Sequence, residues 1–384
     1  MDREVYMEAP PEVRKEGVVW KLNKAVYGMY DAGRKWFFKV EETLVRLGCV
    51  KSKYDHCLFT YRRAGQLAGI ILLWVDDIFH AGSEDFEREV MKEIQREFLI
   101  GRTAEETFLY IGLSIETTSA GITLEQIGYI RDRVEPAELR GGTNDRPLDK
   151  EEMKLLRRQT GKINWAATQS RPDLAYDVVE LSTKFKNGTL GDLKKANKAI
   201  SKLTSNPTKL LFPKITGKIR LTTHSDAGFH NLPDQISSGR GHIIFLEGEG
   251  GRAAPLGWTS NKVKRVVGST VAAEALSMQM ALAHSIYLRA ILAETLGVED
   301  RSIPIKAHID SNNLYQAIIS TKFVEDKRLR LDIAQIQEEI KDQQVQVKWV
   351  NSDCMLADSL TKKNAKADKL MEALKTGTLP ALRN

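Results

Sequence analysis

Apolar residues in the first 140 positions alternate between the spacing of strands and the spacing of helices. They recur at helical spacing from Gly28 to Gly48, and Gly48 provides a stop signal. A second, charged amphipathic helix is predicted over 83–98, with Ser83 as its N-cap. Strands are predicted over 18–22, 57–63, 67–75, 77–82, 108–117 and 121–126. The pattern predicts a sheet covered by helices in this region.

The middle of the chain changes from this pattern to a polar segment and then to helices. Residues 135–150 are rich in turn-forming and polar residues, which predicts a linker. Residues 151–205 are predicted to be helical. No internal repeat or low-complexity tract is visible in the sequence.

A new order of elements begins at Lys218. The long helix predicted over 270–297 carries an apolar stripe and stops at Gly297. Strands are predicted over 218–229, 241–248, 254–262, 303–310 and 345–350, and further helices over 312–320, 327–341 and 354–363. This order predicts a mixed five-stranded sheet with helices packed on it, so the expected fold class is α/β and α+β.

Composition narrows the class of protein only slightly. The 384 residues are 42% hydrophobic and 28% charged, which is typical of a soluble protein. A net charge of +6 fits a polyanionic partner, although scattered Lys and Arg are also common on ordinary solvated surfaces. Three cysteines without a CxxC pair predict a reducing compartment and no structural zinc.

The apolar segments predict no membrane partner. The first residues carry charges where a signal peptide needs an apolar core. The longest apolar run, Leu67–Val75, is too short to span a bilayer. We therefore expect an intracellular protein, in the cytoplasm or the nucleus.

Two adjacent carboxylates, Asp76 and Asp77, interrupt this apolar run in the stretch LLWVDDIF. They lie where one predicted strand turns into the next. Such a pair can bind a cation, whereas a lone Asp-Asp is more often a polar turn at a sheet edge.

Four further carboxylates lie at the ends of predicted elements in the second half of the chain. They are Asp226, Glu274, Asp310 and Asp358. Four buried carboxylates would repel one another, and two Mg²⁺ ions, which prefer oxygen ligands, would neutralise them. Such an ion pair can activate water for phosphodiester cleavage. Alternatively, each residue is a turn former or a helix cap, placed there by chance.

The second half of the chain resembles the ribonuclease H domain of copia-type LTR retrotransposon Pol polyproteins. The resemblance rests, in order, on SDAGF, GWTSNKVKRVVGSTVAAEAL, HIDSNNL and KWVNSDCMLADSLTKK. It implies a ribonuclease H-like fold, the four carboxylates above as ligands of two Mg²⁺ ions, and the RNA strand of an RNA–DNA hybrid as substrate. Many ribonucleases H have a histidine in the loop before the last carboxylate, and residues 351–355 contain none.

The first half resembles the reverse transcriptase domain of the same family. The matching segments are KAVYGMYDAGRKWFFKV, YDHCLF, LLWVDDI, FLYIGLSIE and TQSRPDLAY. The resemblance implies that Asp76 and Asp77 bind Mg²⁺ at a polymerase site that takes a template–primer. Trp74 stands where the family usually has Tyr, and Asp31 and Gly33 replace Gln and Pro.

The family's first catalytic Asp lies in a strand upstream of the segment EVYMEAP, which begins here at residue 4. Without that third carboxylate the palm should bind metal weakly. We therefore expect a palm-like domain without polymerase activity of its own.

The resemblance divides the chain into four expected parts. These are a truncated palm-like domain (1–140), a linker and helical connection (141–214), a ribonuclease H-like domain (215–364) and a C-terminal tail (365–384). The expected function is Mg²⁺-dependent hydrolysis of RNA in a hybrid. The alternatives are a non-catalytic nucleic-acid-binding relic of a retroelement and a cellular nuclease of the same fold.

Several other residues are candidates for nucleic-acid contacts. They are Arg34, Lys35, Trp74 and Lys262, together with a lysine stripe at 194, 195, 198 and 202 that a solvated helix face explains equally simply. His224, His230 and His308 lie near the carboxylates but are expected to have no chemical role. For Arg171-Pro172-Asp173 we expect a capping or packing role.

Overall fold

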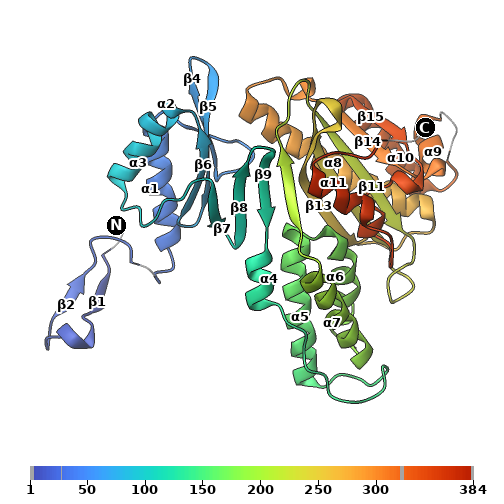
Figure 1. Cartoon of the computed structure of the whole chain (residues 1–384), viewed down its shortest axis with the longest axis horizontal. Helices are drawn as coiled ribbons and strands as arrows, with labels where there is room; N and C mark the ends of the chain where they lie inside the picture. Colours follow the sequence, from blue (N-terminus) through green and yellow to red (C-terminus); the bar gives the residue numbers. More distant parts are fainter. Residues whose placement is uncertain (1–3, 27, 321–323, 382–384) are drawn as a thin grey trace. The chain divides into compact units, whose positions relative to one another are not determined.

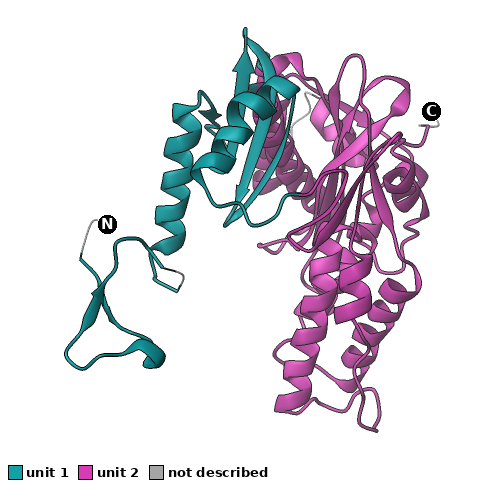
Figure 2. Cartoon of the chain, turned by 60° about the vertical axis from the view of Figure 1, so that its left-hand side comes forward, with its two compact units in different colours: residues 1–103, 294–298 teal, residues 104–293, 299–384 magenta. Residues whose placement is uncertain are grey.

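The computed structural model of the chain describes residues 4–26, 28–320 and 324–381. The chain forms two compact units, residues 1–103 with 294–298 and residues 104–293 with 299–384 (Figure 2). The expected fold class is confirmed, because both units combine sheets with helices. The domain boundaries expected at 140, 214 and 364 remain predictions, and the last three residues of the expected tail lie outside the described residues.

The first unit is built around an antiparallel sheet with strand order β3-β4-β5-β6 (Figure 1). Its helices and strands are β1 (Tyr6–Glu8), β2 (Val19–Lys21), α1 (Ala32–Arg46), β3 (Val50–Lys51), β4 (Leu58–Arg63), β5 (Gln66–Trp74), β6 (Asp77–Gly82), α2 (Glu84–Phe86) and α3 (Lys92–Glu97). Strands β1 and β2 form a separate hairpin. The helices and strands predicted from the apolar spacing are therefore present.

The helix predicted over 83–98 is present and begins as expected. The Ser83 side chain accepts a hydrogen bond from the Phe86 backbone N–H at 3.3 Å. One wider π turn, Glu87–Met91, lies between α2 and α3. Phe86 is fully buried against the sheet, where Gly69 and Gly82 are cross-strand partners on β5 and β6. The missing side chains of these two glycines make room for the Phe86 ring.

We expect Gly69→Ala to destabilise the first unit. A Cβ at position 69 would lie 2.2 Å from Phe86 Cδ2, so the ring would have to move out of a packed core. Such overpacking costs about 1–3 kcal/mol. Gly33→Ala is the matched control, because a Cβ at this helical position meets nothing within 4 Å. Denaturant unfolding of both variants measures the difference, and equal stability would contradict the packing argument.

The first part of the second unit contains a small antiparallel sheet and the helices α4 to α7. The small sheet has the order β10-β9-β8-β7. Its elements are β7 (Thr107–Tyr110), β8 (Leu113–Thr118), β9 (Gly121–Glu125), α4 (Ile127–Arg133), α5 (Lys150–Gln169), α6 (Ala175–Ser182), α7 (Leu190–Ser205) and β10 (Lys209–Pro213). The helices predicted over 151–205 are present.

The single strand predicted over 108–117 is wrong. The chain turns sharply at Ile111 and Gly112, whose φ angles are +44° and +79°, so that β7 folds back on β8 as a hairpin. The apolar spacing continues through this turn and conceals it. The sequence also did not predict α4 and β10.

The large sheet of the second unit has the order β13-β12-β11-β14-β15. Strands β11 to β13 are antiparallel neighbours, whereas β14 and β15 run parallel to β11 and to each other. Its elements are β11 (Arg220–Gly228), β12 (Gly239–Glu247), β13 (Ala253–Lys262), α8 (Thr270–Leu296), β14 (Ile305–Ile309), α9 (Asn312–Ile319), α10 (Lys327–Gln343), β15 (Val345–Trp349) and α11 (Asp368–Thr376). The mixed five-stranded sheet predicted from the sequence is confirmed.

The last predicted helix, 354–363, is wrong. The chain forms two short 3₁₀ turns there, Ser352–Cys354 and Asp358–Leu360. The regular helix at this end of the chain is α11, which lies in the expected tail.

The two faces of the large sheet pack against different groups of helices. Ile244 belongs to a core with Ala275 and Met278 of α8. Its neighbour Ile243 faces the other way, into a core that contains residues of α5, α7 and α11. The Trp258 indole N–H also donates to the backbone carbonyl of Ala167 on α5 at 2.8 Å. The helical segment 150–205 is therefore packed directly on this sheet.

A buried histidine pair makes this unit sensitive to acid. His242 Nε2 and His284 Nδ1 lie 2.9 Å apart, and burial lowers the pKa of His242 to about 3 and also lowers that of His284. His242 is thus neutral in the folded chain down to a low pH, and half-buried His284 is shifted in the same direction, whereas the unfolded chain takes up protons below a pKa of about 6.5.

We expect His242 to lower the free energy of unfolding as the pH drops below about 6.5, whereas the raised pKa of Asp226 acts in the opposite direction over the same range. His242 alone contributes a slope of about 1.4 kcal/mol per pH unit. In His242→Gln the dependence of the free energy of unfolding on pH should lack this contribution. In His56→Gln, where an exposed histidine is replaced, the contribution of His242 should remain. Denaturant titrations between pH 7 and pH 5 measure the difference. Identical slopes for all three proteins would contradict this prediction.

Candidate active site

Three acidic side chains from separate elements meet at one end of the large sheet. Asp226 lies near the end of β11, Asp310 directly follows β14, and Glu274 is in the first turns of α8. Because His224 on β11 is level with His308 on the parallel β14, the two aspartates lie level two residues further on. One carboxylate oxygen from each of the three residues lies within 4.8 Å of the others.

Asp358, the fourth predicted ligand, is held beside this group by a lysine. It lies in the 3₁₀ turn Asp358–Leu360, and its oxygens are outside the 4.8 Å set. Lys362 Nζ lies 2.7 Å from Asp358 Oδ1 and 3.1 Å from Asp226 Oδ1, so that one ammonium bridges the two carboxylates. The structure thus brings three of the four residues together and links the fourth to them through Lys362.

The electrostatics of the site favour a cation. Burial, opposed in part by Lys362, raises the pKa of the fully buried Asp226 to about 7. Burial, reinforced by Asp226 and Asp310, raises the pKa of Glu274 well above its usual range. Burial also raises the pKa of Asp358. For Lys362, the attraction of Asp226 and Asp358 outweighs burial and raises the ammonium pKa. Close, desolvated carboxylates of this kind are stabilised by positive charge.

The donors fit a small divalent ion. Mg²⁺ takes oxygen ligands at about 2.1 Å, so two oxygens on opposite sides of the ion are about 4.2 Å apart. Asp226, Glu274 and Asp310 offer carboxylate oxygens within 4.8 Å of one another, so the side chains would have to move closer together to share one ion.

Hydroxyl groups and one indole fix the positions of these carboxylates. Thr361 donates to Asp226 Oδ2, and Ser352 donates to Asp310 Oδ2 at 2.8 Å. Trp349 donates to the backbone carbonyl of Asp310 at 2.9 Å, and Ser277 donates to that of Asp226 at 2.7 Å. The loop 351–355, which lacks a histidine, thus presents a serine to Asp310.

These supporting residues, and Lys362 above all, were not predicted as part of the site. The signal for Lys362 was present in the sequence: it lies four residues after Asp358, a spacing at which a lysine and a carboxylate can pair along one turn. The serine and threonine hydroxyls carry no comparable signal, because such residues are common in any loop.

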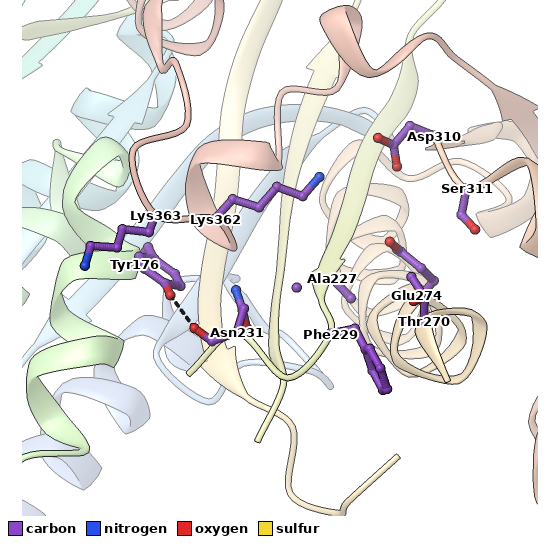
Figure 3. A pocket seen from close by; sticks show the side chains of 11 residues that line it. Tyr176, Ala227, Phe229, Asn231, Thr270, Glu274, Asp310, Ser311, Lys362 and Lys363 are labelled. Carbon is purple, nitrogen blue, oxygen red and sulfur yellow. Dashed lines mark hydrogen bonds between the residues drawn. The ribbon is translucent and has the colours of Figure 1, made fainter. Parts of the chain in front are cut away.

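The site opens into a cavity of about 480 Å³ (Figure 3). The side chains that line it include Tyr176, Phe229, Asn231, Thr270, Ser311 and Lys363. Tyr176 reaches the cavity from α6, and its hydroxyl donates to the backbone carbonyl of Asn231 at 2.9 Å. In Figure 3 the amino group of Lys362 points toward the side where Asp310 and Glu274 lie, whereas Lys363 points away from them. The helical segment therefore forms part of the cavity wall.

The first unit presents its two adjacent aspartates on an exposed turn. Asp76 and Asp77 are exposed at the turn between β5 and β6, where Trp74 pairs with Asp77. Val75 has a φ of +53°, which is rare for a β-branched residue. The Trp36 indole N–H donates to the Val75 carbonyl at 2.9 Å and ties the turn to α1. Trp36 therefore has a structural contact at this turn.

The residues expected to contact nucleic acid differ in the contacts that their side chains already make within the protein. Lys35 Nζ lies 3.0 Å from Asp31 Oδ2, so its charge is balanced by the unusual carboxylate at position 31. The Arg34 guanidinium lies over the Phe38 ring, 5.3 Å from its centroid. Trp74 is exposed, and Lys262 pairs with Asp234 at 3.2 Å. Nucleic-acid binding by these four residues remains a prediction.

Three lysines of the predicted stripe on α7 have partners within the unit. Lys194 bonds to Asn144, Lys195 to Glu180 and Lys202 to Asp173. These contacts favour the solvated helix face over a continuous track for a phosphate backbone.

Arg171 has the capping role expected for its motif. It is fully buried, and its Nη1 donates to the carbonyls of Leu203 and Asn206 at the end of α7. Its other nitrogens donate to both carboxylate oxygens of Asp173, at 2.8 and 3.0 Å. The turn Pro172–Leu174 packs against the turn Asp358–Leu360. This motif thus supports the chain that carries Asp358.

Two of the histidines near the carboxylates bind each other. His308 Nδ1 and His224 Nε2 lie 3.2 Å apart in the interior, and burial lowers the pKa of His224 well below its usual range and that of His308 to about 4. His230 Nε2 lies 3.3 Å from the backbone carbonyl oxygen of Val267. All three have structural contacts, and the absence of a chemical role remains a prediction.

A sequence family described as reverse transcriptase (RNA-dependent DNA polymerase) matches residues 1–147. The retrovirus-related Pol polyprotein from transposon RE1 of Arabidopsis thaliana is 26% identical over 376 residues, covering 94% of this chain and 25% of that protein. The polyprotein from transposon TNT 1-94 of Nicotiana tabacum is 23% identical, covering 94% of this chain and 28% of that protein. The chain thus spans about a quarter of the length of these curated relatives.

The solved structures that align with parts of this chain include a ribonuclease H and a reverse transcriptase. LC11-RNase H1 in complex with an RNA/DNA hybrid aligns with 40% of this chain and 99% of its own, at 18% identity and a TM-score of 0.28. The foamy viral protease-reverse transcriptase in complex with dsDNA covers 87% of this chain and 62% of its own, at 13% identity and a TM-score of 0.20.

The chain is related to the Pol proteins of retroelements, and its N-terminal part matches the reverse transcriptase family. More particularly, the resemblance to copia-type Pol polyproteins that the sequence motifs predict is confirmed. Among the residues that the structure describes, no helix is both long and apolar enough to cross a bilayer.

Proposed function

We propose that the second unit is a divalent-metal-dependent ribonuclease H, which hydrolyses the RNA strand of an RNA–DNA hybrid. The observation that carries this proposal is the meeting of Asp226, Glu274 and Asp310, from three elements far apart in sequence, within 4.8 Å of one another. The order of the large sheet supports it, because β11 and β14 are adjacent and parallel and so bring two of the aspartates to one edge.

Asp226, Glu274, Asp310 and Asp358 would hold the ions. When bound, two Mg²⁺ ions supply activated water and stabilise the leaving oxygen in phosphodiester cleavage. Thr361 and Ser352 orient the carboxylates of Asp226 and Asp310 through their hydrogen bonds. Asp310 and Glu274 both line the cavity (Figure 3). The products expected are 3′-hydroxyl and 5′-phosphate ends.

The cavity wall offers groups that suit a nucleic acid backbone. Lys363 contributes positive charge at its edge, and Phe229 stacks on His230 with ring centroids 3.9 Å apart. Positive charge attracts phosphates, and exposed ring faces suit sugars and bases. The net charge of +6 acts in the same direction.

The palm-like unit is proposed to have no polymerase activity by itself. Asp76 and Asp77 belong to no group of three close metal-ligating side chains among the residues that the structure describes. Two exposed carboxylates alone would bind a divalent ion weakly. A template–primer remains the expected partner of this unit, through Arg34, Lys35 and Trp74.

The test is a cleavage assay with the whole chain. A labelled RNA–DNA hybrid is incubated with Mg²⁺, with EDTA, and with Mg²⁺ and the variant Asp226→Asn. Cleavage that requires both Mg²⁺ and Asp226 supports the proposal. An uncut hybrid that binds the chain would indicate a non-catalytic relic, and cleavage of branched DNA in its place would indicate a cellular nuclease.

A further inference from the structure

The four carboxylates of the proposed ribonuclease site divide into two halves that share Asp226. Asp226, Glu274 and Asp310 form one half, with oxygens close enough to hold an ion. The other half consists of Asp226 and Asp358, and Lys362 Nζ lies between them at 3.1 and 2.7 Å. The ammonium therefore stands where a cation shared by these two carboxylates would bind.

We propose that Lys362 is an internal cation that occupies the second metal position, so that a second divalent ion enters only when Lys362 leaves. This inference rests on the proposed function, because it assumes that Asp226, Glu274 and Asp310 hold the first ion. Lys362 acts through the ligands and is a positioning residue of the site.

The environment of Lys362 suits a group that can leave. Its side chain is 41% exposed, whereas that of Asp226 is 0% exposed, so the lysine reaches the buried carboxylate from the solvent side. A lysine carries its charge on a flexible four-carbon stem with few geometric requirements. Rotation of this stem can move the ammonium into solvent, while Asp226 and Asp358 remain fixed by the protein around them.

The electrostatic consequence is unequal binding of two ions. The first ion meets three carboxylates, of which only Asp226 is paired with Lys362. The second ion must displace an ammonium that already neutralises Asp226 and Asp358, and it is repelled while that ammonium stays. The wild-type chain is therefore expected to bind one divalent ion tightly and a second one weakly.

Calorimetric titration of the whole chain with Mg²⁺, and separately with Ca²⁺, tests this inference. Lys362→Met should tighten the second binding event about tenfold or more, because a competing charge is gone and two carboxylates are left unneutralised. Lys363→Met removes the same charge from the neighbouring residue, which points away from the carboxylates (Figure 3). It should change the second dissociation constant less than about threefold.

The outcomes separate this inference from the function on which it rests. If the first ion binds and the second binds no more tightly in Lys362→Met, the role of Lys362 is refuted and the metal site stands. If neither ion binds the wild-type chain and hybrid stays uncut, the proposed function fails and the inference fails with it.

A measurement on the wild-type chain avoids the risk that Lys362→Met folds poorly. Pulsed acetylation of lysine amines, read by mass spectrometry, reports how exposed each ammonium is. Reaction at Lys362 should rise as Mg²⁺ reaches the concentration that loads the second ion, while reaction at Lys363 stays constant. Unchanged or falling reactivity of Lys362 across this titration would overturn the inference.

Discussion

Replacing Asp226 with Asn is expected to reduce the rate of hybrid cleavage by about 1000-fold or more. Asp226 is the residue shared by both halves of the carboxylate group, so its charge would serve both proposed ions. Asn keeps the shape of the side chain and removes that charge. Losses of this size are common when a group that stabilises the transition state electrostatically is removed.

The same substitution should leave the fold intact, which separates chemistry from stability. Asp226→Asn loses its ion pair with Lys362. It also relieves a repulsion, because Asp226 raises the pKa of Glu274, and Asp358 and Asp310 raise the pKa of Asp226, in each case in addition to burial. We therefore expect a melting temperature without metal within a few degrees of the wild type. The increase in melting temperature with Mg²⁺ should be smaller, because a bound ion stabilises only the protein that binds it.

Asp342→Asn provides the matched control for this experiment. Asp342 is an exposed residue of α10 in the same unit and lies outside the carboxylate group. Asp342→Asn makes the same chemical change as Asp226→Asn. The Asp342→Asn protein should cleave hybrid at the wild-type rate and should respond to Mg²⁺ as the wild type does. An Asp226→Asn protein that cuts hybrid at the wild-type rate would rule out the proposed site.

The sequence predicted the large sheet well because its signals are strong and local. Strands β11 to β15 and α8 have long apolar patterns that end at clear stop signals such as Gly297. The failures lie where the pattern is continuous or short. The β7–β8 turn at Ile111 and Gly112 keeps the apolar spacing, and the turns at 352–360 are too short to differ in pattern from a helix. Which strands are neighbours depends on long-range pairing that no local pattern records.

The candidate site was predictable to a similar extent. Strand ends and helix starts indicated Asp226, Asp310, Glu274 and Asp358, and the family resemblance supported the same four residues. The bridge by Lys362 was not predicted, because it depends on how the turn after Asp358 is oriented toward β11. The contribution of α6 to the cavity was missed for the same reason, since Tyr176 and Asn231 are 55 residues apart in sequence.

Arg171→Met is expected to lower the free energy of unfolding of the second unit by about 3–5 kcal/mol. The substitution leaves the buried carboxylate of Asp173 without its bidentate partner, and Lys202, at 2.9 Å, balances that charge only from its exposed edge. It also leaves the carbonyls of Leu203 and Asn206 at the end of α7 without their donor. Denaturant unfolding, followed by a probe in the second unit, measures the loss.

The double variant Arg171→Met/Asp173→Leu tests whether the unpaired charge is the cause. Removing both partners of a buried ion pair costs less than removing one, so the double variant should be more stable than Arg171→Met. Because the Pro172–Leu174 turn packs against the turn that carries Asp358, hybrid cleavage should also weaken in Arg171→Met under conditions where the protein is still folded. A single variant as stable as the wild type would show that the Arg171–Asp173 pair contributes little to this unit. A destabilised variant with full cleavage activity would instead show that this turn does not position Asp358.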